Sequence, residues 1–305
     1  MKSRIAVVGA GLMGHGIAQA FATAGHNVKL VDAHKETLKA APGRIAASLA
    51  ELGIEPGPVL DRIELSGSLK DAVSGADVVM EAASEKLELK RAIFREAAEA
   101  APADALLASN TSSIPITEIG RELPERARRR LAGVHWWFPP VLIPLVEIVS
   151  TEFLDPEYFE RAYRLIESIG KEPVRVYRDV PGFIGNRLLH SLVREALSMV
   201  DAGVCDGETI DKVVRSSFGR RFSVLGPMEG VDLVGLELVR DVHSYLFPSL
   251  EKSGEPSPLL DRLIDEGKVG VRTLEGVRKW TPEQVAETRN RVSSGLIAMA
   301  RKAKG

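Results

Sequence analysis

The sequence of 305 residues has one cysteine, few aromatic side chains, no excess of charge of either sign and no long apolar run. The single cysteine, Cys205, cannot form an internal disulfide or a multi-cysteine zinc site, and we expect no metal. With 40 Lys and Arg against 42 Asp and Glu, the net charge of −2 provides no positive field for nucleic acid or an anionic membrane. No apolar run reaches the roughly 20 residues that span a bilayer, and the first residues lead into a strand pattern rather than a signal peptide. We therefore expect a cytoplasmic protein without nucleic-acid or membrane partners.

The composition, with 45% hydrophobic and 27% charged residues, is that of an ordinary globular protein. At about 150 residues per domain, the length is compatible with two domains. The expected partner is a small molecule rather than a polymer.

A β-turn-α-β pattern opens the chain. Residues 4–8 are a short β-rich run, and Gly9-Ala10-Gly11-Leu12-Met13-Gly14 leads from it into an amphipathic helix pattern. A second strand pattern at 27–31 ends in Asp32. This order of elements is typical of the first unit of a Rossmann fold.

Strand patterns continue to alternate with helix patterns. Further strands are expected at 62–66, 77–83, 105–109, 131–136, 144–150 and 173–177. Such alternation predicts an α/β fold with a Rossmann-type, doubly wound and mostly parallel sheet. The Pro-rich link at 139–144 is too short for a helical crossover, so the two strands that it joins are expected to be antiparallel.

Helix patterns dominate after Asp179-Val180-Pro181-Gly182. From Ile184 the apolar positions trace one helix face, which is closed by Gly203. Ser257-Pro258 and Thr281-Pro282-Glu283-Gln284 mark later helix starts, the latter with a capping-box Gln. We predict a Rossmann domain over residues 1–180 and an all-helical domain for substrate binding and dimerisation over residues 181–305.

The glycines and the acid of the opening unit predict the cofactor. Gly9 permits a tight turn, Gly11 lets the backbone approach a pyrophosphate, and Gly14 allows close packing of helix on strand. The helix N-terminus offers N–H groups to the same anion. Asp32 would accept hydrogen bonds from both ribose hydroxyls and repel a 2′-phosphate, so the pattern favours NAD over NADP.

Polar side chains follow the ends of neighbouring parallel strands, where ligands bind in such sheets. Glu85 follows one strand, Ser112 the next, and His135 lies near the end of a third, with Glu147 on the adjoining strand. A buried imidazole paired with a carboxylate is a common general base, although a satisfied core histidine would give the same pattern. Ser112 alone, before Ile114-Pro115, is more typical of a turn or cap residue.

Five strings spread over most of the chain resemble the L-3-hydroxyacyl-CoA dehydrogenase family. They are SNTSSIPIT at 109–117, GVHWWFPP at 133–140, PLVEIV at 144–149, DVPGFIGNRL at 179–188 and GPMEGVDLVG at 226–235. Their order and spacing make the resemblance more specific than the glycine pattern.

The resemblance implies a role for each matching residue. His135 would be the catalytic base, Glu147 its orienting partner, and Ser112 and Asn186 polar groups around the substrate oxygen. The family also implies a homodimer formed through the helical domain. It further places two charged residues near the nicotinamide ribose: Glu85 and Lys90.

Two departures from the family bear on the substrate. Phe138 stands where the family usually has Asn, and a phenyl ring cannot replace the amide's donor and acceptor. Only Lys35, Lys39 and Arg44 stand where short-chain CoA enzymes present a lysine-rich helical pair. The implied substrate is a 3-hydroxyacyl-CoA, and the alternatives are a small free hydroxy acid, as in gulonate and carnitine dehydrogenases, or an aromatic aldehyde. A crystallin-like dinucleotide-binding protein without activity is the non-enzymatic alternative.

Overall fold

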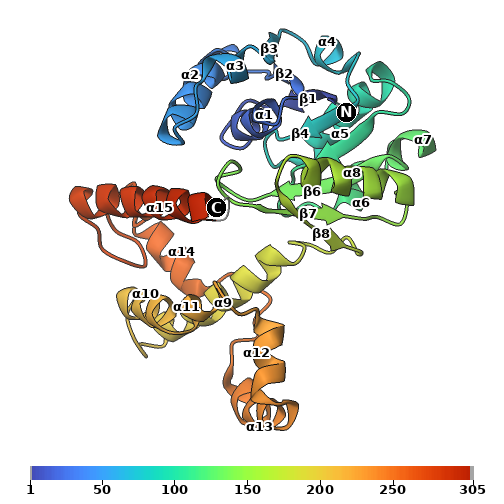
Figure 1. The fold of residues 1–305 in the computed structure, drawn as a ribbon. Coiled ribbons are helices and arrows are strands. Elements are labelled where there is room, and N and C mark those ends of the chain that lie inside the picture. The colour runs from blue at the N-terminus through green and yellow to red at the C-terminus, as the bar shows by residue number, and fades with distance from the viewer. Residues whose placement is uncertain (1, 303–305) are drawn as a thin grey trace. The chain divides into compact units, whose positions relative to one another are not determined.

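An eight-stranded sheet forms the centre of the first part of the chain (Figure 1). The computed structural model describes residues 2–302. The strand order is β3-β2-β1-β4-β5-β6-β7-β8. The strands are β1 (Arg4–Val8), β2 (Asn27–Val31), β3 (Ile63–Ser66), β4 (Val78–Glu81), β5 (Leu106–Ser109), β6 (Leu131–Trp136), β7 (Leu145–Val149) and β8 (Glu172–Val176). Each strand predicted from the sequence is confirmed, with bounds that differ by at most two residues.

All neighbouring strands pair in parallel except β6 and β7. The Pro-rich link between those two reverses the chain directly, which confirms the antiparallel pair predicted from its length. The register places His135 directly opposite Glu147. Because directly opposite residues of such a pair point to the same face, the two side chains can meet.

Helices cover both faces of the sheet, and successive residues of each strand alternate between two apolar cores. In β1, Ile5 and Val7 join one core while Ala6 and Val8 join the other. The first face is covered by α1 (Gly14–Thr23), α2 (Lys35–Glu51), α3 (Gly57–Leu60) and α8 (Pro156–Ser168). The second is covered by α4 (Leu69–Val73), α5 (Leu87–Ala100), α6 (Ile116–Gly120) and α7 (Glu125–Arg128). A sheet buried on both faces explains why its strands read as continuous apolar runs.

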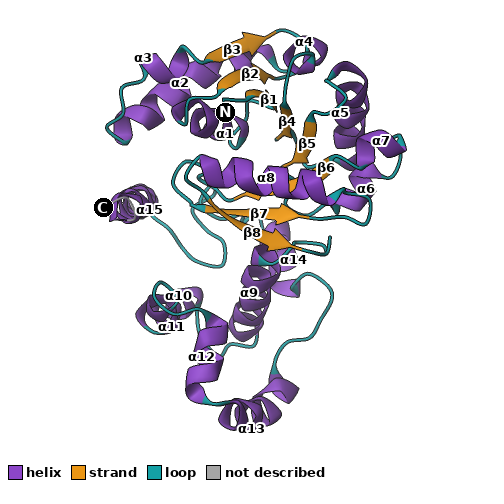
Figure 2. Ribbon diagram, turned by 45° about the vertical axis from the view of Figure 1, so that its right-hand side comes forward, coloured by secondary structure: helices purple, strands orange, loops and turns teal. Residues whose placement is uncertain are grey.

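The remaining chain is helical, as predicted (Figure 2). Its elements are α9 (Gly185–Asp201), α10 (Gly207–Ser216), α11 (Phe218–Arg221), α12 (Pro227–Val234), α13 (Leu236–Leu246), η1 (Phe247–Ser249), α14 (Pro258–Asp265) and α15 (Pro282–Lys302). The capping box predicted before α15 is present: Thr281 N–H donates to Gln284 Oε1, and Gln284 N–H donates to Thr281 Oγ1.

The described residues form two compact units, with Leu188–Ser293 as the helical unit and the sheet in the other. Within the described residues, no helix has both the length and the apolar character needed to cross a membrane.

Candidate active site

His135 and Glu147 form a buried pair at the carboxyl end of β6. The imidazole Nδ1 lies 2.8 Å from Glu147 Oε2, and the two side chains are 4% and 1% exposed. Since a carboxylate only accepts, Nδ1 carries the proton and donates it to Oε2. The other ring nitrogen, Nε2, lies 3.2 Å from Ser112 Oγ; in the neutral imidazole it has the lone pair and accepts from the Ser112 hydroxyl. The pair is therefore arranged to accept a proton at Nε2.

The Glu147 carboxylate is surrounded by N–H donors. Its Oε1 accepts hydrogen bonds from the backbone N–H groups of Ile184 (2.9 Å) and Gly185 (3.1 Å), at the start of α9. Its Oε2 accepts a second bond, from Trp137 Nε1 at 3.3 Å. Burial acts to raise the pKa of Glu147, but the bonds from His135, Gly185 and Ile184 outweigh it and lower the pKa below its ordinary value. Glu147 is therefore ionised at neutral pH.

Ser112 lies beside the imidazole, and Asn186 is bonded to Ser112. Ser112 is exposed on the loop that follows β5, and Asn186 is half-buried in the first turn of α9. Asn186 Nδ2 donates to the backbone oxygen of Ser112 at 3.2 Å, not to its hydroxyl. The structure thus brings together the four residues that the sequence singled out for catalysis.

The predicted cofactor turn has the close packing that its glycines imply. Gly9 has φ +103°, and a Cβ on Gly14 would lie 1.7 Å from the Gly9 oxygen, so neither position tolerates a side chain. A Cβ on Gly11, in contrast, would meet nothing within 4 Å, which leaves open space over the turn. Asp32 Oδ2 accepts from Ala10 N–H at 2.7 Å and thereby joins the end of β2 to this turn. These residues fit a dinucleotide, with the pyrophosphate at the turn and a ribose at Asp32.

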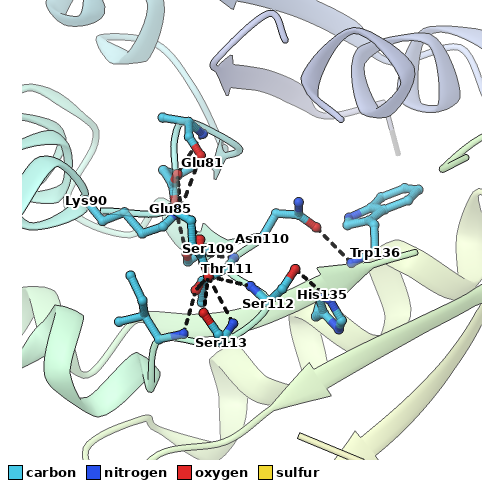
Figure 3. Close-up of polar contacts among 12 residues, drawn as sticks. Glu81, Glu85, Lys90, Ser109, Asn110, Thr111, Ser112, Ser113, His135 and Trp136 are labelled. Carbon is cyan, nitrogen blue, oxygen red and sulfur yellow. Dashed lines mark hydrogen bonds and ion pairs between the residues drawn. The ribbon is translucent and has the colours of Figure 1, made fainter. Parts of the chain in front are cut away.

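Glu85 holds the loop that carries Ser112 (Figure 3). Its Oε1 accepts from Thr111 Oγ1 (2.6 Å) and from the N–H groups of Ser112 (3.0 Å) and Ser113 (2.9 Å). Burial acts against the carboxylate, but these bonds and the charge of Lys90 lower the pKa of Glu85 to about 2. Glu85 is therefore a fixed negative charge that positions Ser112.

Lys90 is buried rather than open to a ligand. Its ammonium lies 2.7 Å from Glu81 Oε1 and 3.2 Å from Glu85 Oε2, and its side chain is 1% exposed. Glu81 itself is fully buried and also accepts from Ser109 Oγ at 2.6 Å. In this structure Lys90 therefore contacts two carboxylates, Glu81 at the end of β4 and Glu85 in the loop that follows it. Gly9 adjoins the same region, since a Cβ there would lie 2.6 Å from the Ala82 oxygen.

Two family models match the chain. The NAD binding domain of 3-hydroxyacyl-CoA dehydrogenase matches residues 4–180, and the C-terminal domain of 3-hydroxyacyl-CoA dehydrogenase matches residues 182–280. The chain belongs to the 3-hydroxyacyl-CoA dehydrogenase family. It is an NAD-dependent oxidoreductase, as the sequence predicted. The crystallin-like alternative without activity is therefore set aside.

Relatives within the family act on different substrates. The chain is 34% identical over 307 residues to 5-formyl-3-hydroxy-2-methylpyridine 4-carboxylate 5-dehydrogenase of Mesorhizobium japonicum, covering 99% of this chain and 98% of that one. It is 38% identical over 237 residues to L-carnitine dehydrogenase of Streptomyces griseus, covering 77% of this chain and 70% of that one. A crystal structure of a 5-formyl-3-hydroxy-2-methylpyridine 4-carboxylic acid 5-dehydrogenase, described as an NAD+-dependent dismutase, matches with a TM-score of 0.91 and 33% identity. That match covers 100% of this chain and 99% of the other.

Phe138, which stands where the resemblance led us to expect Asn, is 56% exposed. It follows β6 and precedes a cis bond to Pro139. The phenyl ring offers a ligand only apolar contact.

Glu81 and Trp137 are polar partners of the site that the sequence pattern did not indicate. Glu81 ends β4, so the strand-end rule that selected Glu85 could also have selected it. Trp137 gave no such signal, because the direction of its indole N–H depends on its tertiary contacts with Gly185 and His135.

Proposed function

We propose that this protein oxidises the 3-hydroxyl of a 3-hydroxyacyl-CoA or a small 3-hydroxy acid to the 3-keto product, with His135 as general base. The observation that supports the proposal is the buried His135–Glu147 pair, in which Nδ1 is engaged by the carboxylate and Nε2 of the neutral imidazole can accept a proton at the carboxyl edge of the sheet. General bases of this kind contribute about 10²–10⁴-fold to a rate.

The chain's own residues would move and hold the proton. His135 Nε2 would take the hydroxyl proton, and Glu147 would stabilise the imidazolium that forms. Ser112 and Asn186 would donate hydrogen bonds to the oxygen as it becomes a carbonyl. The cofactor would be held by Asp32 and the glycine turn. When bound, NAD+ accepts the hydride from the substrate carbon that carries the hydroxyl.

The cationic side chains of α2 bear on whether the substrate carries CoA, because the phosphates of CoA need positive partners. Lys35 and Lys39 are exposed on α2. Arg44 instead donates to the backbone oxygens of Ala10 (2.9 Å) and Thr37 (2.8 Å), which binds it to the cofactor turn. Two lysines remain for the CoA phosphates, and this small number supports keeping the free hydroxy acid in the proposal.

Oxidation of an aromatic aldehyde is the second candidate. It is favoured by the pyridine-aldehyde relative, whose similarity extends over 99% of this chain. The exposed ring of Phe138 offers a surface on which an aromatic substrate could stack.

NADH absorbance with a matched panel tests the proposal. The panel pairs 3-hydroxybutyryl-CoA with free 3-hydroxybutyrate, and adds gulonate, carnitine and a pyridine aldehyde, each with NAD+; acetoacetyl-CoA with NADH tests the reverse direction. Turnover of the thioester or of a free hydroxy acid supports the proposal and identifies which of the two is used. Turnover of the aldehyde alone would replace it with the second candidate.

The proposal includes a homodimer formed through the helical unit. Among residues 188–293, no hydrophobic side chain is buried in the single chain. A groove of about 380 Å³ in this unit is lined by apolar residues of α12 and α13, among them Val234, Leu238 and Val242. Such a unit lacks a core of its own, and a second copy would supply one. The cytoplasmic location stays a prediction.

A further inference from the structure

The indole of Trp137 contacts both members of the His135–Glu147 pair. Its Nε1–H donates to Glu147 Oε2 over 3.3 Å, and the same oxygen accepts the Nδ1–H of His135 at 2.8 Å. Oε2 therefore shares its negative charge between two donors. This contact comes from a side chain that nothing in the strand-end pattern singled out.

Close packing fixes the indole in this position. A Cβ on Gly185 would lie 2.3 Å from Cζ2 of Trp137, so the first turn of α9 packs directly on the ring. The ring also contacts the imidazole, since the ring centroids of Trp137 and His135 are 5.6 Å apart. Contacts with Gly185 and His135 thus hold the indole whose N–H donates to Oε2.

The groups around His135 come from four elements. The Glu147 carboxylate on β7 and the Ser112 hydroxyl after β5 bond to the ring. The Trp137 indole after β6 and the Phe183 ring before α9 pack against it. The ion pair of Glu85 and Lys90 reaches the site through the Ser112 N–H, which donates to Glu85. Among these, Glu147 is the charged group bonded to the imidazole. On β8, the residue paired with Glu147 is the apolar Val174. Removing a hydrogen bond to Glu147 Oε2 therefore changes the attraction between Oε2 and the His135 proton directly, because no other charged group lies between them.

We infer that Trp137 is a positioning residue for the base, whose indole N–H holds the Glu147 carboxylate and weakens its attraction for the His135 proton. The inference rests on the proposed function, in which His135 Nε2 accepts the proton of the substrate. Because the indole satisfies part of the charge on Oε2, the imidazolium is stabilised less than Glu147 alone would stabilise it. The imidazole consequently stays unprotonated, and active as a base, down to a lower pH.

Trp137→Phe removes the N–H and keeps an aromatic ring. We expect the acidic limb of the kcat/KM profile for oxidation to move up by roughly half to one pH unit, the size of one hydrogen bond. The titration midpoint of the His135 ring, followed by NMR in enzyme labelled at histidine, should rise by the same amount. The NMR titration needs no substrate, so it tests the inference independently of turnover. If the smaller ring disturbs folding, benzothienylalanine at position 137 keeps the indole shape without the N–H.

Trp136→Phe is the matched control. Trp136 is 2% exposed in the core on the opposite side of β6, and its Nε1 has no hydrogen-bond partner among the described residues (Figure 3). This variant loses the same N–H one residue away and should keep the wild-type pH profile.

The outcomes separate this inference from the proposed function. A rise of both midpoints in Trp137→Phe, with neither moved in Trp136→Phe, supports the inference. Unchanged midpoints in Trp137→Phe overturn it, even if His135 is the base. If instead a His135→Ala variant keeps its turnover, the proposed function itself fails.

Discussion

At the scale of single residues, Glu147 links the proposed base, His135, to the backbone at the start of α9. It accepts from His135 on one oxygen and from the start of α9 on the other. That His135 and Glu147 point to the same face of the sheet could be predicted. The Pro-rich link at 139–144 is too short for a crossover, so the two strands must be antiparallel, and the alternation of side chains along each strand then decides which residues share a face. The bonds from Ile184, Gly185 and Trp137 could not, since they depend on the packing of segments far apart in the sequence.

Glu85 should stabilise the fold in a pH-dependent way. Its pKa of about 2 lies below the ordinary 4.5, so its contribution is fully present above about 4.5 and is lost as the pH falls through about 2. Glu85→Gln should lower the free energy of unfolding by about 1–2 kcal/mol at pH 7, a modest value because the side chain is 38% exposed. Urea unfolding between pH 7 and pH 2.5 should show the difference from wild type shrinking with acid.

Glu88→Gln is the control for that series. Glu88 lies on α5, is 78% exposed and pairs with Arg91 at 2.8 Å. Because the Glu88 carboxylate itself is largely in solvent, this i,i+3 pair contributes about 0.3–0.5 kcal/mol, and the variant should stay near wild type throughout. A Glu85→Gln effect that is equally small, or that grows with acid, would show that Glu85 is not the fixed charge described above.

At the scale of elements, the strand patterns predicted the sheet well because buried parallel strands give continuous apolar runs. The helices α3, α4, α6 and α7 were not predicted, since four or five residues are too few to show a helical period. The buried position of Lys90 was not predicted either, because a charged residue on a helix pattern normally indicates a solvated face. Only the pairing of α5 with the end of β4 places Glu81 beside it.

The Lys90–Glu81 pair should be costly to break from one side. Lys90→Met leaves a fully buried carboxylate without its cation, and such losses typically cost about 3–5 kcal/mol. The double variant Lys90→Met/Glu81→Gln removes the uncompensated charge and should recover part of that loss. Urea unfolding of the two variants measures both effects. Equal stabilities of the single and double variants would contradict the account of a buried, mutually dependent pair.

At the scale of the whole molecule, the chain consists of a sheet-containing unit with two cores and a helical unit without a buried apolar side chain of its own. The helical character of the second part was predictable from its periodicity. The lack of a core was not, because an apolar helix face looks the same in sequence whether its own unit or another chain covers it. The boundary at residues 180–181 stays a prediction.

The account predicts a dimer in solution. Light scattering during size exclusion at micromolar protein should give twice the chain mass of 33.1 kDa. Leu238→Glu places a charge on an exposed position of the apolar groove, which is 57% exposed in the single chain, and should shift the protein toward the monomer. Glu237→Gln, one residue away on α13, should leave the mass unchanged. A wild-type protein that runs as a monomer would contradict the dimer.

The central claim is that His135 takes the substrate proton. The most direct measurement is turnover of His135→Ala with the substrate identified by the NADH screen, alongside calorimetric titration of NAD+ into the same variant. His26→Ala, at the opposite edge of the sheet, is the control. We predict a loss of kcat of at least about a hundredfold in His135→Ala with NAD+ affinity retained. Wild-type turnover in that variant would contradict the account.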